Sequence, residues 1–329
     1  MKAVRWGILG VSKHFITRVM PPMMKTDSSE VYAIASRDGE KAQAAAKKYG
    51  IPVAYSSYDD LLADDSIEVV FIPLPNHMHL EWIKRAADAG KHILCEKPLT
   101  LNAAETQEAI DYAESKGVLL MEAFMYRLHP QWQRAKELIH GGILGSVTSV
   151  QTFFGYNNPD PGNIRNKLEM GGGGIYDIGC YAVSVARHMF GTEPQRALSL
   201  INRDPVFGTD MLASGILDFG AGQSTFTVAT KTFACQKVDI FGTGGSIHIH
   251  IPFNAYDDVP STITVVNGVG TREVYFEPAD QYGLQADAFS RAVREGGAVP
   301  IPITDALNNS KALDALFASE KSGGWETIS

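Results

Sequence analysis

The stretch Val4-Arg-Trp-Gly-Ile-Leu-Gly10-Val-Ser-Lys-His-Phe15 decides the fold, because it joins a buried strand to a glycine turn and a helix. Val4 to Leu9 predicts a strand that is buried on both faces. Gly10 then opens a turn of the kind that places backbone N–H groups and a helix N-terminus beside a pyrophosphate. The G-x-G-x-x-G pattern is incomplete, since Ser12 and Phe15 replace the second and third glycines. The loop alone is therefore equally compatible with an ordinary strand-to-helix turn.

Strands and helices alternate outward from this stretch through the first third of the chain. The predicted strands are Val31 to Ala35, Val69 to Ile72, His92 to Cys95 and Val118 to Met121. The predicted helices, each followed by a glycine, are Asp38 to Tyr49, His79 to Ala89 and Ala103 to Lys116. Continuous apolar strands with glycine-terminated helices between them predict an α/β Rossmann domain, a parallel sheet with both faces covered.

The rest of the chain has a different pattern, with long strand segments and few helices. The predicted strands are Val147 to Tyr156, Met211 to Phe219, Gln223 to Thr230, Lys237 to Phe241, Ser246 to Ile251, Thr262 to Val266 and Thr271 to Phe276. Helices are predicted at Pro130 to His140 and Asp305 to Glu320. We expect an α+β domain with a large open, mostly antiparallel sheet. The boundary near Glu122 gives domains at 1–121 and 122–329, and the last helix could pack back on the first domain.

Composition limits the function classes. The 329 residues carry a formal charge of −8 and no apolar stretch long enough for a membrane span, so neither nucleic-acid nor membrane binding is expected. Cys95, Cys180 and Cys235 are too few and too far apart for a disulfide framework or a zinc cage. We therefore expect no metal and a reducing, cytoplasmic location.

The end of the second predicted strand bears on cofactor choice. Enzymes that use NAD usually place Asp or Glu there, against the ribose 2′-hydroxyl. Here Ser36-Arg37 supplies a hydroxyl and a guanidinium, which suit a 2′-phosphate. The alternative is that Ser36 caps the next helix and Arg37 is solvated. Asp38 is adjacent and keeps NAD(H) possible, but the pattern favours NADP(H).

Four further motifs occur in a fixed order. Pro73-Leu-Pro-Asn76-His-Met-His79 and Glu96-Lys97-Pro98 each follow a predicted strand. Glu122-Ala-Phe-Met-Tyr-Arg127-Leu-His129-Pro130 opens the second part, and Gly171 to Gly174 precedes Asp177-Ile-Gly-Cys-Tyr181. Together they resemble the glucose–fructose oxidoreductase/inositol dehydrogenase family (Gfo/Idh/MocA), over essentially the whole chain.

The resemblance implies a Rossmann domain with a nicotinamide cofactor at a cleft, a carbohydrate-oxidoreductase domain, and homo-oligomers, dimers or tetramers, packed through the sheets. By position it implies a set of cofactor-binding residues: Gly10, Ser12, Ser36, Arg37, Pro75, Asn76, His79, Glu96 and Lys97. The inositol-type pattern has a catalytic His where Tyr181 stands here. A Tyr at that position resembles the branch that holds xylose dehydrogenase and dimeric dihydrodiol dehydrogenase.

Interconverting an alcohol and a carbonyl needs a hydride from the cofactor and a proton handled by the protein. Lys97 and Tyr181 form a plausible acid/base pair, because a nearby ammonium favours the phenolate and lowers the pKa of a tyrosine. If a helix follows the glycines, Asp177 and Tyr181 share a face, and Asp177 could position a substrate hydroxyl or Lys97. Asn163, Arg165 and Arg127 are candidate substrate contacts.

The leading hypothesis is an NADP(H)-dependent dehydrogenase or reductase for a small carbohydrate-like molecule: a sugar, cyclic polyol or dihydrodiol. One alternative is a catalytically silent regulatory protein of the same fold that binds NADP(H) or sugar. Another is a hydrolase that uses bound NAD in an oxidation–elimination cycle.

Overall fold

The computed structural model describes residues 2–329, which form two compact units. The first runs to Met125 and includes the later segment Asp280–Leu307, and the second comprises Tyr126–Ala279 and Asn308–Ser329. These units are not the same division as the predicted domains, because Asp280–Leu307 joins the first unit. The boundary at Glu122 stays a prediction.

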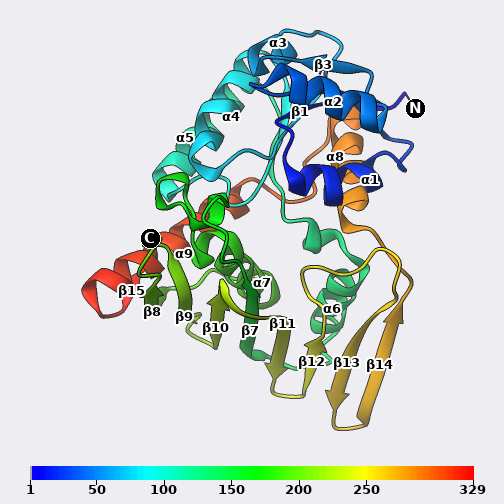
Figure 1. The fold of residues 1–329 in the computed structure, drawn as a ribbon. Helices are drawn as coiled ribbons and strands as arrows, with labels where there is room; N and C mark the ends of the chain where they lie inside the picture. Colours follow the sequence, from blue (N-terminus) through cyan, green and yellow to red (C-terminus); the bar gives the residue numbers. More distant parts are fainter. Residues whose placement is uncertain (1) are drawn as a thin grey trace. The chain divides into compact units, whose positions relative to one another are not determined.

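The first unit is built on a six-stranded parallel sheet with the order β3-β2-β1-β4-β5-β6 (Figure 1). Its strands are β1 (Val4–Leu9), β2 (Ser29–Ala35), β3 (Val53–Tyr55), β4 (Val69–Ile72), β5 (His92–Cys95) and β6 (Leu120–Glu122). This order reverses between β1 and β4, which is where dinucleotides bind in open α/β sheets. The α/β prediction is confirmed.

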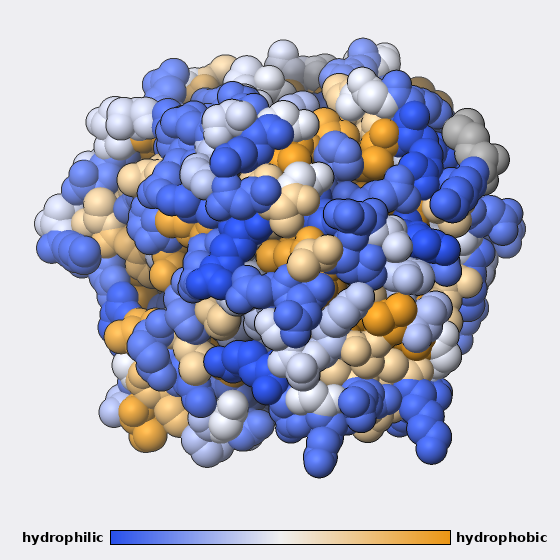
Figure 2. All heavy atoms as spheres, turned by 90° about the horizontal axis from the view of Figure 1, so that it is seen from above, coloured by the Kyte–Doolittle hydropathy of each residue, from blue (hydrophilic) through white to orange (hydrophobic). Residues whose placement is uncertain are grey.

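Helices cover this sheet. They are α1 (Met20–Met23), α2 (Gly39–Tyr49), α3 (Tyr58–Leu62), α4 (His79–Asp88), α5 (Ala103–Ser115) and α8 (Gln281–Glu295), with a short π-helical segment at Phe15–Val19 and a 3-10 turn at Asn76–Met78. The sequence pattern missed α8, which packs on β1: the Trp6 indole N–H donates to the Ser290 hydroxyl at 3.1 Å. The face in Figure 2 is mostly hydrophilic, with small scattered hydrophobic patches, as expected of solvated helices.

The second unit is built on a nine-stranded sheet with the order β14-β13-β12-β11-β7-β10-β9-β8-β15. Its strands are β7 (Val147–Asn157), β8 (Arg196–Arg203), β9 (Asp210–Asp218), β10 (Gln223–Ala229), β11 (Lys231–Gly242), β12 (Gly245–Ile249), β13 (Ser261–Asn267), β14 (Gly270–Phe276) and β15 (Glu326–Thr327). All pairs are antiparallel except β7 with β10. The prediction of a mostly antiparallel sheet is confirmed, although it missed β8 and β15.

Helices of the second unit are α6 (Pro130–His140), α7 (Cys180–Phe190) and most of α9 (Thr304–Ser322). A 3-10 turn at Met125–Leu128 precedes α6, turns at Ile164–Asn166 and Leu168–Met170 precede the glycines, and a π-helical segment at Ile175–Gly179 leads into α7. One face of the sheet is buried: on β10, Ser224, Phe226 and Val228 are buried, whereas Thr225 and Thr227 on the other face are not. No helix described between residues 2 and 329 is long and apolar enough to cross a membrane.

Candidate active site

The predicted cofactor residues of the first unit follow the carboxyl ends of four neighbouring strands. Gly10 follows β1, Ser36 follows β2, Pro75 follows β4 and Glu96 follows β5. The parallel register pairs Leu9 with Ala35 and Ile72 with Cys95, so these strands end at one edge of the sheet. The edge also collects the residues next to them in sequence: Ser12, Arg37, Asn76 and Lys97.

The turn after β1 would let a cofactor pyrophosphate come close to the protein backbone. Gly10 has a φ of 115°, which L side chains rarely adopt, and its N–H donates to the Ala35 carbonyl at 2.9 Å. A Cβ at Gly10 would lie 3.2 Å from the Leu74 side chain and 3.5 Å from the Tyr58 hydroxyl oxygen. Ser12 caps the following helix, because its hydroxyl oxygen accepts from the Phe15 N–H at 3.1 Å. This loop therefore fits a pyrophosphate without the second and third glycines.

The residues that follow β2 carry a hydroxyl group and a positive charge. The Asp38 carboxylate caps α2, accepting from the Lys41 N–H at 3.1 Å, while Ser36 is 8% exposed and accepts from the Asp38 N–H at 3.1 Å. Arg37 is exposed, and burial raises the pKa of the nearby Tyr58 although the positive charge of Arg37 opposes this. With the Asp38 carboxylate committed to the helix, the donor set suits an anionic 2′-phosphate better than a ribose hydroxyl.

Glu96, at the end of β5, is held as a carboxylate. The His14 Nε2 lies 3.4 Å from Glu96 Oε1, and the Lys97 N–H donates to Glu96 Oε2 at 3.3 Å. Burial alone would raise the pKa of Glu96, but the His14 hydrogen bond and the charges of His14 and Lys97 outweigh it and lower that pKa. His14 also stacks edge-on against Tyr282 of α8, at 5.6 Å between ring centroids. The sequence pattern did not single out His14, although it lies in the quoted loop.

Both ring nitrogens of His79 lie against backbone carbonyl oxygens. It is fully buried, with Nε2 2.9 Å from the Leu74 carbonyl oxygen and Nδ1 3.0 Å from that of Pro98. Burial lowers the pKa of this imidazole. His79 therefore ties the segment after β4 to the segment after β5, and its role toward a cofactor stays a prediction.

The second unit brings four of the predicted site residues together. Asp177 and Tyr181 lie one turn apart on the helix that runs from Ile175 through α7, as expected if a helix follows the glycines. Asp177 Oδ2 accepts from the Arg165 Nε–H at 2.8 Å and from the Tyr156 hydroxyl at 2.6 Å. Asn163 caps the turn before Arg165, with its side-chain oxygen accepting from the Arg165 N–H at 3.0 Å.

The two tyrosines of this region have different environments. The Tyr181 ring packs against Phe253 at 5.0 Å and against Tyr126 and Phe154 at 5.9 Å, and it is 6% exposed. Burial and the Asp177 carboxylate raise the pKa of Tyr156, so Tyr156 stays a hydrogen-bond donor and cannot serve as a base. The sequence pattern missed Tyr156, because its partner is 21 residues away.

A buried aspartate supports the glycine stretch. Asp210, 2% exposed at the start of β9, accepts from the Ile175 N–H with Oδ2 at 2.5 Å. A Cβ at Gly173, whose φ is 122°, would lie 1.8 Å from Asp210 Oδ1. Burial raises the pKa of Asp210 to about 7, although the Ile175 hydrogen bond opposes this. Gly173 is therefore required for Asp210 to reach the start of the helix that carries Asp177 and Tyr181.

Arg127 lies in the turn before α6, half-buried, and its charge helps to lower the pKa of Lys136 and of His188. Lys97 belongs to the first unit and Tyr181 to the second, so the acid/base pair stays a prediction.

Comparison with known proteins identifies the class. Residues 4–124 match the Gfo/Idh/MocA model described as "oxidoreductase family, NAD-binding Rossmann fold", and residues 132–248 match a C-terminal domain of the same family. The chain belongs to the Gfo/Idh/MocA family and is an oxidoreductase.

Relatives agree with the predicted branch. A D-xylose 1-dehydrogenase (NADP+) of Haloferax volcanii is 39% identical, over 97% of this chain and 98% of that protein. A mouse trans-1,2-dihydrobenzene-1,2-diol dehydrogenase is 32% identical, over 75% and 74%. A 3-ketoreductase of Actinomadura kijaniata, solved with NADP and TDP-benzene, superposes with a TM-score of 0.90 at 25% identity, covering 96% of this chain and 98% of that one.

Proposed function

We propose that this protein is an NADP(H)-dependent oxidoreductase that interconverts an alcohol and a carbonyl on a sugar, cyclic polyol or dihydrodiol. The observation that carries the proposal is the polar edge of the first sheet, where the Gly10 turn, Ser36, Arg37 and Glu96 follow the carboxyl ends of adjacent strands. The family membership and the named activities of the relatives support the reaction class.

NADP(H) is favoured over NAD(H) by the chemistry at the end of β2. Arg37 supplies a positive charge next to Ser36, and the Asp38 carboxylate is occupied as a helix cap. The Haloferax relative is named as an NADP+ enzyme, and the Actinomadura structure contains NADP. Gly10, Ser12, Pro75 and Asn76 would hold the rest of the cofactor, with Glu96 beside the nicotinamide ribose.

The cofactor supplies or takes up the hydride, and the protein moves the proton. In the proposed mechanism, Tyr181 exchanges a proton with the substrate oxygen and the Lys97 ammonium lowers the pKa of that phenol. Asp177, anchored by Arg165 and Tyr156, positions a substrate hydroxyl. Asn163 and Arg127 are further proposed substrate contacts.

The test is a cofactor-reduction screen across aldoses, inositols and dihydrodiols, run with NADP+ and NAD+ in parallel. We expect turnover with at least one of these classes and a lower KM for NADP+. A protein that binds cofactor but reduces none of it in this screen would contradict the proposal and favour the regulatory alternative. Release of NADPH in proportion to product would exclude the hydrolase alternative.

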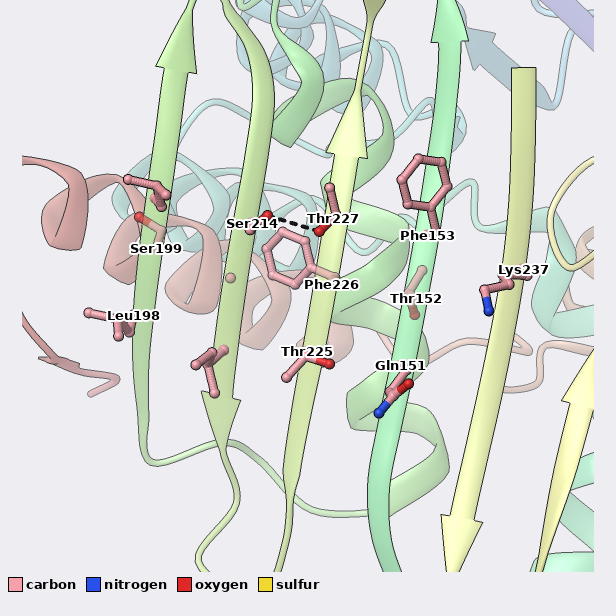
Figure 3. A pocket seen from close by; sticks show the side chains of 13 residues that line it. Gln151, Thr152, Phe153, Leu198, Ser199, Ser214, Thr225, Phe226, Thr227 and Lys237 are labelled. Atoms are coloured by element: carbon pink, nitrogen blue, oxygen red, sulfur yellow. Dashed lines mark hydrogen bonds between the residues drawn. The ribbon is translucent and has the colours of Figure 1, made fainter. Parts of the chain in front are cut away.

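We further propose that the chain forms homo-oligomers through the uncovered face of the nine-stranded sheet. A hollow of about 470 Å³ lies on this face, across β8 to β11. Figure 3 shows its side chains, among them Phe153, Thr227 and Lys237, with Ser214 and Thr227 hydrogen-bonded at 2.8 Å. Leu200 on β8 is 72% exposed and Tyr275 on β14 is 69% exposed, which is costly for a sheet face left in water. Sedimentation of the purified chain measures the oligomer size.

We also place the protein in the cytoplasm. Cys95 and Cys180 are buried free thiols and Cys235 is an exposed one, which fits a reducing compartment. Fractionation of the source cells, with the activity assay as readout, tests this.

A further inference from the structure

His14 joins the turn after β1 to the end of β5. It is the residue before the π-helical segment at Phe15–Val19, and its Nε2 lies 3.4 Å from Glu96 Oε1, within ion-pair distance. The other oxygen of the Glu96 carboxylate, Oε2, accepts from the Lys97 N–H at 3.3 Å. Each carboxylate oxygen therefore has a partner, and the two partners belong to segments that follow different strands.

The imidazole of His14 is itself held by α8. It packs edge-on against the Tyr282 ring, with 5.6 Å between the ring centroids and 71° between the planes. Tyr282 lies in the first turn of α8, which Asp280 caps by accepting from the Tyr282 N–H at 3.0 Å. α8 packs against α1 (Figure 1), so closely that a Cβ on Gly283 would lie 3.3 Å from Pro22 Cβ. A packed helix thus sets the position of the ring.

This arrangement keeps Glu96 ionised and restricts its orientation. Its side chain is 15% exposed, and a carboxylate that is largely removed from water stays charged only with charged or hydrogen-bonding partners. An ionised carboxylate only accepts hydrogen bonds, and each oxygen keeps a further lone pair when one is occupied. Held by His14 and Lys97, Glu96 can therefore still accept hydrogen bonds from the hydroxyl groups of a ribose.

From this arrangement we infer that His14 is a positioning residue for Glu96 and, through Glu96, for the nicotinamide ribose of a bound cofactor. The inference rests on the proposed function for the identity of the cofactor. It adds a residue that lies beyond the strand ends, and it requires only groups within the first unit. A carboxylate that is oriented before the ligand arrives raises affinity, because less ordering remains to be done on binding.

The test compares binding of NADPH and 2′,5′-ADP by calorimetry, because 2′,5′-ADP contains the adenosine half of the cofactor and lacks the nicotinamide ribose. His14→Phe keeps a ring against Tyr282 and removes the Nε2 atom. It is expected to weaken NADPH binding roughly five- to tenfold and to leave the affinity for 2′,5′-ADP near the wild-type value. His14→Gln returns a nitrogen donor on a side chain of similar reach, and should restore most of the NADPH affinity.

Two comparisons separate positioning from a general structural role. His92→Phe is the matched control, since His92 is also a β5 residue whose ring nitrogen makes a contact, accepting from the Leu119 N–H at 3.0 Å, and its loss should leave both affinities unchanged. Glu96→Gln should weaken NADPH binding, and adding His14→Phe to it should cause little further loss, because His14 acts through Glu96.

The fluorescence of bound NADPH reports on the nicotinamide half directly. Its anisotropy at saturation should be lower in His14→Phe than in wild-type protein and close to wild type in His14→Gln, because a loosely held ring reorients faster. Tyr282→Leu covers the case in which His14→Phe does not fold: it keeps His14 and Glu96, removes the ring that holds His14, and should give an intermediate anisotropy. Wild-type anisotropy in both His14→Phe and Tyr282→Leu would contradict the inference.

The failure of the inference and that of the proposed function are distinguishable. If wild-type protein binds neither NADPH nor 2′,5′-ADP, the proposed function fails and the inference fails with it. If both ligands bind and His14→Phe leaves NADPH affinity unchanged, or weakens both ligands alike, the inference about His14 is overturned and the proposed function stands. Additive losses from His14→Phe and Glu96→Gln would also overturn it, because His14 would then act independently of Glu96.

Discussion

The carboxyl edge of the first sheet and the glycine stretch of the second unit position their polar side chains in different ways. At the edge, each residue stands where a parallel strand ends, so the strand register alone brings Gly10, Ser36 and Glu96 together. In the second unit, Asp177 and Tyr181 are positioned by a helix whose start depends on Asp210, a residue from a distant strand. The first arrangement follows from topology, and the second depends on individual long-range hydrogen bonds.

The largest expected effect concerns Tyr181. Tyr181→Phe removes the proposed proton-transfer group and should lower kcat by about 10²–10⁴-fold, with cofactor affinity unchanged. Steady-state kinetics and NADPH binding measure the two quantities. Full turnover in Tyr181→Phe would remove this residue from the chemistry, and Lys97→Ala makes the same test for its partner.

The second effect is on stability. Gly173→Ala places a Cβ 1.8 Å from Asp210 Oδ1 at a φ of 122°, so the substitution should strain the backbone and displace Asp210. Together these should cost roughly 3–5 kcal/mol of unfolding free energy, measured by urea denaturation. Gly50→Ala, at a positive φ with open space around the new Cβ, is the matched control and should cost clearly less. Equal losses would show that Asp210 plays no part.

The third effect is a pH dependence of stability. Burial raises the pKa of Asp210 to about 7, above the value near 3.8 of an unstrained aspartate, so the folded state favours the protonated form. Its contribution is therefore complete below about pH 4 and is lost as the pH rises to about 7. Asp210→Asn stays neutral, so its stability relative to wild type should increase by roughly 3–4 kcal/mol between pH 4 and pH 7 and level off above. A difference that is independent of pH would contradict the protonated state.

The smallest expected effect is a change in the substrate KM on substitution of Tyr156. Because its pKa is raised, Tyr156 acts as a donor to Asp177 and not as a base. Tyr156→Phe should raise the substrate KM by roughly two- to tenfold and leave the shape of the pH–rate profile unchanged. A shift of the profile in Tyr156→Phe would instead assign proton transfer to Tyr156.

Sequence reasoning recovered the elements whose pattern is local. The buried strands of the first sheet and the helix after Gly174 follow from apolar runs and glycine turns, and the strand ends put Ser36, Arg37 and Glu96 at one edge of the sheet, where their roles stay predictions. It missed α8, whose start is marked only by the Asp280 cap and whose packing on Trp6 spans 284 residues. Tyr156 was missed for the same reason, since a phenol in a strand is interpreted as core packing until its partner is known.

The parallel pairing of β7 with β10 has a consequence for how this protein can change. The long connection that parallel pairing requires between these two strands holds the residues from Asn158 to Gly174, the helix with Tyr181, and the strands β8 and β9. Insertions and exchanges in its irregular first part leave the register of the sheet intact. The residues from Asn158 to Met170, ahead of the glycines that Asp210 requires, can therefore change in sequence while the strands keep their register.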